Sequence, residues 1–138
     1  MISKGSKETK NITWGYEMKT KLLFICAQNI NRSKTAEHLF KDRYETKSTG
    51  LYNLSPVTRE QLEWADIVIV MEPAHREEIS LLHPDMYLKK KIIILDIPDN
   101  YRYMQPELIE LLEKKMTALE PNITKYLKSG EFPNSHKR

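Results

Sequence analysis

The sequence alternates short apolar runs with segments of helical periodicity, and this alternation constrains the fold more than any other feature. The runs are almost continuously apolar, as strands are when both faces of a parallel sheet are covered. The order of strand and helix predicts the α/β class, with a doubly wound four-stranded parallel sheet and helices on both faces. The expected strands are 22–26, 45–49, 67–71 and 91–95, and the expected helices are 34–44, 59–64, 74–82 and a last one from 106 that continues past Pro121 after a kink.

The chain is long enough for one hydrophobic core. At 138 residues it can bury roughly two thirds of the surface that its unfolded form exposes. We expect a single domain over residues 18–130. Residues 1–17 form a polar N-terminal extension without periodicity, where disorder is expected, and residues 131–138 form a polar C-terminal tail.

The composition excludes several classes of site. A single cysteine excludes a disulfide within the chain, an iron–sulfur cluster and the usual structural zinc site of two or more thiolates. The histidines have no partners at metal-ligand spacing, so we expect them on the surface and expect neither a metal nor a cofactor. They are His38, His75, His83 and His136.

Charge and hydropathy limit the partners further. The 22 basic and 19 acidic side chains leave a formal charge of +3, and the basic residues are scattered, so no nucleic-acid partner is expected. No uncharged apolar run approaches the roughly 20 residues that span a bilayer, and no membrane partner is expected. The polar start of the chain lacks the apolar stretch of a secretory signal, which makes the cytoplasm the expected location.

A cysteine and an arginine separated by five residues follow the first strand, at a position where sheets of this kind bind ligands. The loop from Cys26 to Arg32 can curl so that successive backbone N–H groups point at a phosphate-sized anion, and the next helix adds its N-terminal dipole. Arg32 supplies a planar fork for two phosphate oxygens, and the same positive field favours the thiolate of Cys26. Ser33 is expected to cap this helix, with Glu37 one turn later.

Two other strand ends bring acidic residues to the same rim. Glu72 and Asp96 follow the third and fourth strands, so the loops after them should meet the cysteine loop. A cysteine can also be a small buried hydrophobe, and this interpretation of Cys26 stays open. Its position between an apolar strand and a helix start favours the phosphate loop.

Four segments of the chain follow the order of one known family. They are residues 23–37, with the loop Cys-Ala-Gln-Asn-Ile-Asn-Arg-Ser, the Ser-Thr-Gly of 48–50, the strand and its flanks at 64–72, and the loop Ile-Pro-Asp-Asn-Tyr of 97–101. Over about residues 18–127 they resemble the low-molecular-weight protein tyrosine phosphatases, most closely a short bacterial branch. The resemblance implies that family's fold, with a phosphate loop after the first strand.

The resemblance also implies roles for the loop residues. Cys26 would attack phosphorus to form a phosphocysteine, while Arg32 and the loop amides would hold the phosphoryl oxygens. Ser33 would donate to the sulfur, and Asn29 would take an unusual backbone conformation with support from Ser48. The implied phosphate-binding residues are Ala27, Gln28, Asn29, Ile30, Asn31 and Ser33.

A carboxyl group can protonate the leaving tyrosine oxygen and then activate water. By resemblance this acid is Asp99, because Asp99 and Tyr101 keep the family's spacing, although Asn100 replaces the usual proline. Asp96 is the rival acid. Tyr101 would form a wall of the substrate slot. A histidine that supports the loop in the family has no match within residues 51–56.

Taken with the resemblance, these features predict a metal-independent phosphatase that hydrolyses phosphotyrosine in proteins. The expected partners are a phosphotyrosyl protein and, in the site itself, phosphate or other oxyanions. Three alternatives remain: a phosphocysteine carrier, a non-catalytic phosphate-binding module and an arsenate reductase. A carrier has little use for an acid such as Asp99, and thioredoxin-coupled arsenate reductases need further cysteines, which this chain lacks.

Overall fold

The computed structural model describes residues 12–13, 16–17, 19–52 and 54–131. Two short strands precede the main sheet, where β1 (Ile12–Thr13) pairs antiparallel with β2 (Tyr16–Glu17). The rest of the expected extension, and all but the first residue of the expected tail, lie outside the described residues. None of the helices in the described part of the chain combines the length and apolar character that a membrane crossing needs.

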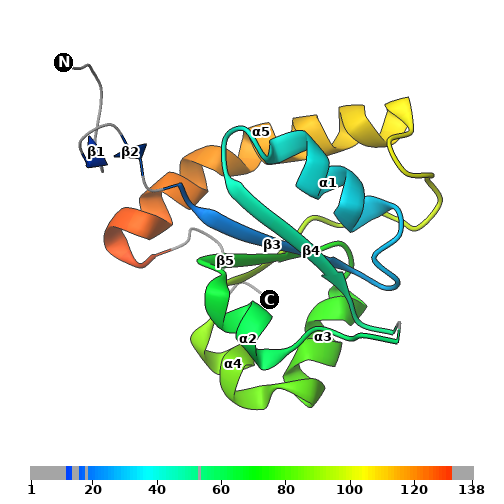
Figure 1. Ribbon diagram of the computed structural model, residues 1–138, viewed down its shortest axis with the longest axis horizontal. Helices are drawn as coiled ribbons and strands as arrows, with labels where there is room; N and C mark the ends of the chain where they lie inside the picture. The colour runs from blue at the N-terminus through cyan, green and yellow to red at the C-terminus, as the bar shows by residue number, and fades with distance from the viewer. Residues whose placement is uncertain (1–11, 14–15, 18, 53, 132–138) are drawn as a thin grey trace.

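The main sheet has four strands, all parallel, in the order β4-β3-β5-β6 (Figure 1). The chain therefore starts in the middle of the sheet, moves to one edge and crosses back to the other side, which is the doubly wound arrangement that the sequence predicts. The strands are β3 (Lys21–Cys26), β4 (Glu45–Gly50), β5 (Ile67–Val70) and β6 (Ile92–Ile94). The predicted fold class is confirmed.

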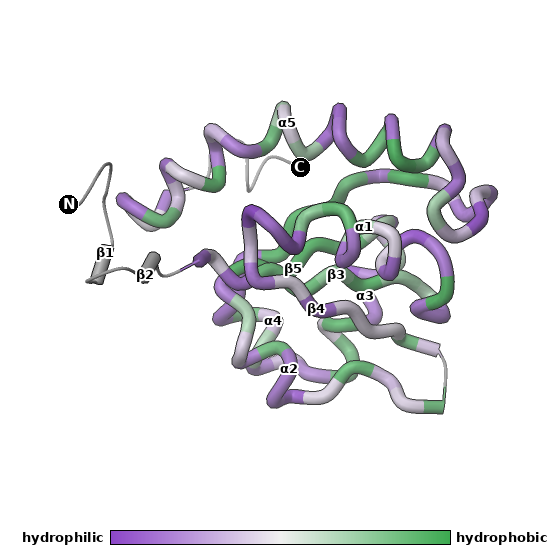
Figure 2. Tube along the Cα trace, turned by 45° about the horizontal axis from the view of Figure 1, so that its top comes forward, coloured by the Kyte–Doolittle hydropathy of each residue, from purple (hydrophilic) through white to green (hydrophobic). Residues whose placement is uncertain are grey.

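Helices cover both faces of this sheet (Figure 1). They are α1 (Arg32–Phe40), α2 (Arg59–Trp64), α3 (Pro73–Leu82), α4 (Pro84–Lys89) and α5 (Pro106–Ser129). The helices α1 and α5 pack on one face, and α2, α3 and α4 pack on the other. Apolar and polar residues alternate along α5 in Figure 2, as expected for a helix with one face on the sheet.

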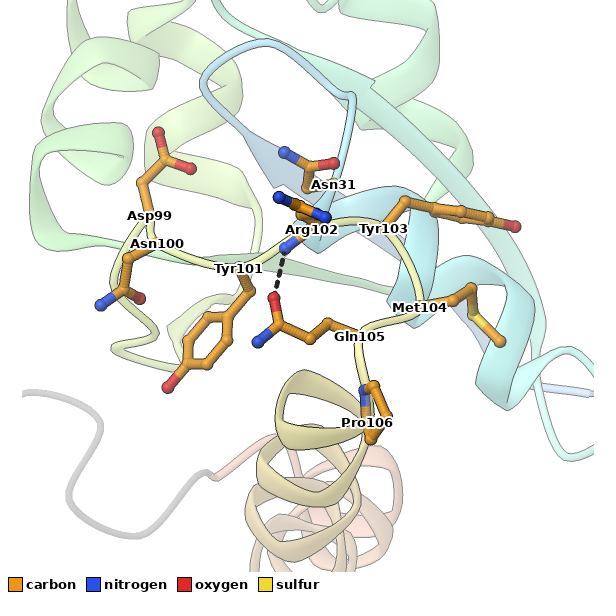
Figure 3. A pocket seen from close by; sticks show the side chains of 9 residues that line it. All are labelled: Asn31, Asp99, Asn100, Tyr101, Arg102, Tyr103, Met104, Gln105 and Pro106. Carbon is orange, nitrogen blue, oxygen red and sulfur yellow. Dashed lines mark hydrogen bonds between the residues drawn. The ribbon is translucent and has the colours of Figure 1, made fainter.

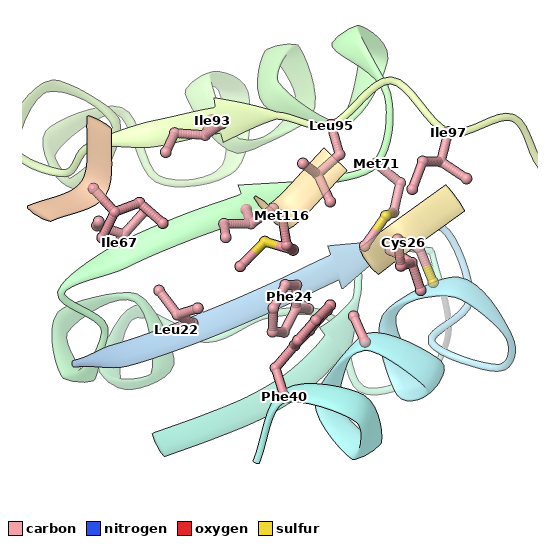
Figure 4. Packing of buried hydrophobic residues seen from close by; sticks show 14 of the residues in the cluster. Leu22, Phe24, Cys26, Phe40, Ile67, Met71, Ile93, Leu95, Ile97 and Met116 are labelled. Carbon is pink, nitrogen blue, oxygen red and sulfur yellow. The ribbon is translucent and has the colours of Figure 1, made fainter. Parts of the chain in front are cut away.

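Alternate residues of each strand enter two separate cores, because successive side chains of a strand point to opposite faces. Leu22 and Phe24 pack with α1 and α5, around Phe40 and Met116 (Figure 4). Leu23 and Ile25 pack with α2, α3 and α4 on the other side. Cys26 is the last residue of β3 in the first of these cores, so the sheet fixes its position at the C-terminal edge.

The structure differs from the expected helices in two places. The first helix begins at Arg32 and ends at Phe40, so Ser33 is a first-turn residue and not the cap; the cap position is held by Asn31. The helix α4 is not among the expected elements: Pro84, directly after His83, takes the first position of a new helix. The last helix continues past Pro121, as expected, and ends at Ser129.

Candidate active site

The cysteine sulfur lies at the bottom of the loop that joins β3 to α1. Cys26 is 3% exposed, and its Sγ atom accepts a hydrogen bond from the Asn29 backbone N–H at 3.2 Å. Asn29 has a φ of 58°, a left-handed conformation that asparagine tolerates better than most residues. This turn of the backbone aims the amide inward at the sulfur, as a loop that cradles an anion requires.

Ser33 bridges the sulfur and the Asn29 side chain. Its Oγ lies 2.9 Å from Cys26 Sγ and 2.6 Å from Asn29 Oδ1. A hydroxyl has one proton to donate, so Ser33 can serve only one of these two acceptors at a time. When Cys26 is a thiol, its S–H can donate to Ser33 while Ser33 donates to Asn29; when Cys26 is a thiolate, the Ser33 proton is available to the sulfur.

The arginine that ends the loop is buried and held from two sides. Arg32 is 2% exposed, and its Nη1 donates to Glu72 Oε2 at 2.5 Å and to the Ile97 carbonyl at 2.7 Å. Glu72 follows β5 and Ile97 follows β6, so three loops of the C-terminal edge meet at one guanidinium. Such charge-assisted contacts fix the plane of the guanidinium fork before any ligand binds.

The two candidate acids are placed differently. Asp99 Oδ1 lies 3.8 Å from Arg32 Nε, and the Asp99 side chain is 62% exposed, so it is available to a ligand and to water. Asp96 has a φ of 63°, and its backbone carbonyl accepts a hydrogen bond from Lys115 Nζ at 3.0 Å. Asp99 therefore lies next to the Arg32 guanidinium, whereas Asp96 is part of the turn after β6 and binds Lys115 through its backbone.

Residues 99–106 and Asn31 line a pocket of about 830 Å³ beside the loop from Cys26 to Arg32 (Figure 3). Thr35 of α1 anchors this segment, because its buried Oγ1 accepts from the Met104 N–H at 2.9 Å and donates to the Asn31 carbonyl at 2.7 Å. Tyr101 is partly buried and packs against the core, with its ring pointing away from the Asp99 carboxylate (Figure 3). The segment is thus tied directly to the loop that holds Cys26.

The segment after β4 closes the other side of the loop. The Ala27 carbonyl accepts hydrogen bonds from the backbone N–H groups of Leu51 and Tyr52, at 3.0 and 2.9 Å. Tyr52 is half exposed, and the pKa of its hydroxyl is raised by partial burial and then by the carboxylates of Glu78 and Glu72. These charges place Tyr52 on the rim near Glu72.

Ser48 does not make the contact that the resemblance implied. Its Oγ donates to Glu37 Oε1 at 2.5 Å, whereas the side chain of Asn29 accepts from Ser33. The reason is position. Ser48 lies on β4 opposite Phe24, and Glu37 of α1 extends over β4 at that level. Support for the Asn29 side chain therefore comes from Ser33, in the first turn of α1.

His75 is the residue of this region that sequence analysis missed. We expected it on the surface, but it is 3% exposed, and its Nδ1 accepts a hydrogen bond from the Glu72 backbone N–H at 3.1 Å. Burial and the nearby Arg32 charge lower its pKa, although Glu72 and Asp99 act in the opposite direction. A signal was available: Pro73 at the first helical position makes His75 the third residue, whose side chain often reaches back to the cap.

The remaining predicted loop residues differ in their exposure to solvent. Ala27 and Asn31 are partly exposed, while Gln28 and Ile30 are exposed, Ile30 to 60%. Within the described ranges, no three His, Cys, Asp or Glu side chains gather in a way that could hold a metal ion. The loop offers amide donors, one guanidinium and one sulfur, which suits a tetrahedral oxyanion.

Solved structures of phosphatases match this fold over most of the chain. The tyrosine phosphatase Wzb from Escherichia coli K30, in complex with phosphate, matches with a TM-score of 0.61 at 24% identity, covering 73% of this chain and 96% of that one. SP-PTP, the low molecular weight protein tyrosine phosphatase from Streptococcus pyogenes, matches with a TM-score of 0.64 at 17% identity, covering 81% and 99%. No protein-family model and no curated protein matches the sequence.

An arginine phosphatase shares the same fold. YwlE from Geobacillus stearothermophilus matches with a TM-score of 0.61 at 20% identity, covering 80% of this chain and 97% of that one. The matches confirm the fold that the resemblance implied, a low-molecular-weight phosphatase fold. Because tyrosine and arginine phosphatases both have it, the fold by itself does not distinguish these substrates.

Proposed function

We propose that this protein is a cysteine-dependent phosphatase that hydrolyses phosphotyrosine in proteins, without a metal, and that residues 18–130 form its single catalytic domain. The observation that carries the proposal is the environment of the Cys26 sulfur, which receives the Asn29 amide at 3.2 Å and contacts the Ser33 hydroxyl at 2.9 Å. Both groups can donate to a thiolate, the form that attacks phosphorus. A purely structural cysteine has no need of two such partners.

In the first step, the Cys26 sulfur attacks phosphorus opposite the tyrosine oxygen. The S–P bond forms as the P–O ester bond breaks, and the oxygen leaves with a proton from Asp99. The exposure of Asp99 and its position 3.8 Å from Arg32 Nε support this role over Asp96. Asp99 gives up its proton in this step and is left as a carboxylate.

In the second step, water attacks the phosphocysteine. Asp99, now a carboxylate, takes the proton from water as the new P–O bond forms and the S–P bond breaks. The Cys26 thiolate leaves and is stabilised by the donors that stabilised it before attack, Asn29 N–H and Ser33 hydroxyl. Inorganic phosphate is the second product.

Arg32 binds the phosphoryl oxygens in both steps. Its Nη1 is engaged by Glu72 and the Ile97 carbonyl, which leaves the other edge of the fork for two oxygens of the ligand. Bound phosphate would displace the 3.8 Å contact of Arg32 with Asp99, freeing that carboxyl group to act on the leaving oxygen. Wzb is solved with phosphate, which is consistent with such a site.

A phosphotyrosine substrate is supported by the apolar and aromatic groups around the loop. Ile30 projects from the loop itself, and Tyr52 is tied to it through Ala27. A ring held above the loop could pack against such groups, since aromatic and aliphatic walls bury an aryl substrate favourably. The likeness to YwlE makes phosphoarginine the second candidate substrate.

The experiment that tests the proposal is hydrolysis of a small aryl phosphate in the presence of EDTA. Cys26→Ser should lower kcat by about a thousandfold or more, because the oxygen of serine is a far poorer nucleophile at neutral pH. Asp99→Asn should lower kcat by about a hundredfold, and Asp96→Asn should change it little. Activity that survives in Cys26→Ser would disprove the mechanism, and a loss confined to Asp96→Asn would reassign the acid.

Paired peptides distinguish the two substrates. A phosphotyrosine peptide and a phosphoarginine peptide with the same flanking residues should be compared by kcat/KM. We expect the phosphotyrosine peptide to be the better substrate by at least about tenfold, because only it presents a ring to the apolar rim. A preference for phosphoarginine would retain the mechanism and replace the substrate.

A further inference from the structure

Tyr103 belongs to two neighbouring pockets. It lines the pocket formed by residues 99–106 and also a second pocket of about 320 Å³ on the exposed side of α1. Figure 3 shows its ring extending over α1, away from Asp99. The second pocket is lined by Lys34, Glu37, His38, Lys41, Thr46 and Tyr103, and we call it the α1 groove.

The α1 groove begins next to the phosphate loop. Lys34 follows Arg32 by two residues, so the groove starts where the loop ends. Lys34 and Lys41 are seven residues apart on the helix, or about 10 Å at 1.5 Å per residue. An extended peptide covers that length with about three residues. The groove is therefore long enough for the residues beside a phosphotyrosine held over Cys26.

The charge of the α1 groove is mainly positive. Lys34, His38 and Lys41 are exposed, and within the described ranges neither lysine lies at ion-pair distance from a carboxylate. The acidic member, Glu37, is partly buried and accepts a hydrogen bond from Ser48 at 2.5 Å. Within the part of the chain that the structure describes, the ammonium groups of both lysines thus remain available to a ligand.

We propose that the α1 groove binds acidic side chains that flank the phosphotyrosine of a peptide substrate. This proposal rests on the proposed function and adds a sequence preference to it. Two lysines on one helix face complement two carboxylates on an extended segment, and Tyr103 gives that segment an apolar surface between the phosphate loop and the groove. Exposed pairs of this kind contribute modestly each, so the preference is expected in KM and not in the chemical step.

The test compares two phosphotyrosine peptides that differ only in their flanks, one with Asp and Glu and the other with Asn and Gln. For the unmodified protein, KM should be roughly three- to tenfold lower for the acidic peptide, with similar kcat. In the double variant Lys34→Gln/Lys41→Gln, the KM values for the two peptides should become nearly equal. Because Lys34 and Lys41 are exposed, added salt should also weaken the preference for the acidic peptide.

Lys89→Gln is the charge control for the single variants Lys34→Gln and Lys41→Gln, because Lys89 is exposed on α4 at the opposite face of the sheet and each of these three changes removes one positive charge. It should keep the preference for the acidic peptide. Equal KM values for the two peptides with the unmodified protein would overturn the proposal, and so would an equal loss of preference in Lys89→Gln, which would indicate net charge alone.

A binding measurement tests the α1 groove independently of the proposed phosphatase activity. Affinity of the fluorescently labelled acidic peptide for Cys26→Ser can be measured whether or not the protein turns over a substrate. Adding Lys34→Gln/Lys41→Gln to that variant should weaken binding by a similar factor. Unchanged affinity would disprove peptide binding in the α1 groove. A failure to hydrolyse the aryl phosphate would instead disprove the phosphatase activity, and the affinity measurement would still decide whether the groove binds acidic peptides.

Discussion

Arg32 Nη1 donates to Glu72 Oε2 at 2.5 Å, and this contact joins the loop after β3 to the end of β5, 40 residues apart in the chain. Arg32 is nearly inaccessible while Glu72 is about one third exposed. A buried guanidinium needs a compensating charge, so Glu72 both orients Arg32 and offsets the cost of its burial. The proposed phosphate site therefore has its guanidinium oriented before a ligand binds.

The first prediction concerns this carboxylate. Glu72→Gln keeps the size of the side chain but removes the charge that holds the Arg32 guanidinium. We expect kcat/KM for an aryl phosphate to fall by about tenfold or more, since a misplaced fork stabilises the transition state poorly. The affinity for vanadate should fall in parallel. Glu77→Gln, an exposed site on α3, is the control, and equal kinetics for Glu72→Gln and Glu77→Gln would contradict the role assigned to Glu72.

The second prediction is a pH dependence of stability. The pKa of His75 is lowered in the folded protein by burial and by Arg32, so the unfolded chain binds a proton more readily. The stability that His75 contributes is present above its unfolded pKa of about 6.5 and is lost as pH falls towards the folded value. His75→Asn can still accept from the Glu72 N–H but cannot be protonated.

Urea denaturation at several pH values checks this dependence. The free energy of unfolding should fall more steeply below about pH 6.5 in the unmodified protein than in His75→Asn. His38→Asn, an exposed position on α1, is the matched control and should follow the unmodified protein. Parallel curves for the unmodified protein and His75→Asn would show that His75 is not the group responsible.

The third prediction concerns Thr35, which anchors the segment 99–106 that contains Asp99. Thr35→Val removes the hydroxyl that accepts from the Met104 N–H and donates to the Asn31 carbonyl. The Met104 N–H loses its acceptor, while the Asn31 carbonyl keeps only the Thr35 backbone N–H, at a cost of about 1 kcal/mol in the free energy of unfolding. We also expect kcat to fall, because residues 99–106 lose their tie to the phosphate loop. Thr35→Ser retains both hydrogen bonds, so it should retain kcat; a similar loss in both variants would refute the anchor.

The fourth prediction concerns oxidation of Cys26, the single cysteine of the chain. Without a second thiol to form a disulfide, a sulfenic acid formed by peroxide depends on an added thiol for reduction. Brief peroxide treatment should therefore be reversible by a thiol, and prolonged treatment should not. Phosphate should protect the enzyme by covering the sulfur. Full recovery after prolonged peroxide would be inconsistent with this account.

Much of the fold could be predicted from the sequence because its signals are local. The apolar run from Ile67 to Met71 predicts a central strand, and β5 occupies residues 67–70 between β3 and β6. Thr58 is the residue before α2 and makes a capping box with Gln61. The short helix α4 escaped prediction because Pro84, its first residue, is also a residue that commonly follows the end of a helix; α4 buries Met86 in the second core.

The site could be predicted less completely because its contacts join distant parts of the chain. The spacing of Cys26 and Arg32 indicates the loop, because only five residues separate them and they follow directly on a strand. By contrast, the strand order predicts that the loop after Glu72 meets the cysteine loop, but no local pattern indicates that Glu72 itself pairs with Arg32 or that Ser48 faces Glu37. The burial of His75 likewise depends on how α3 packs, which a single sequence does not reveal.

The central claim is that Cys26 carries the phosphoryl group during turnover, and trapping that group tests it most directly. Asp99→Asn should slow the second step, so a rapid acid quench during hydrolysis of an aryl phosphate should preserve the intermediate for peptide mass spectrometry. We predict one phosphoryl group on the peptide that contains Cys26, and on Cys26 within it. Turnover without any labelled peptide, or a label on Ser33 in place of Cys26, would contradict the account.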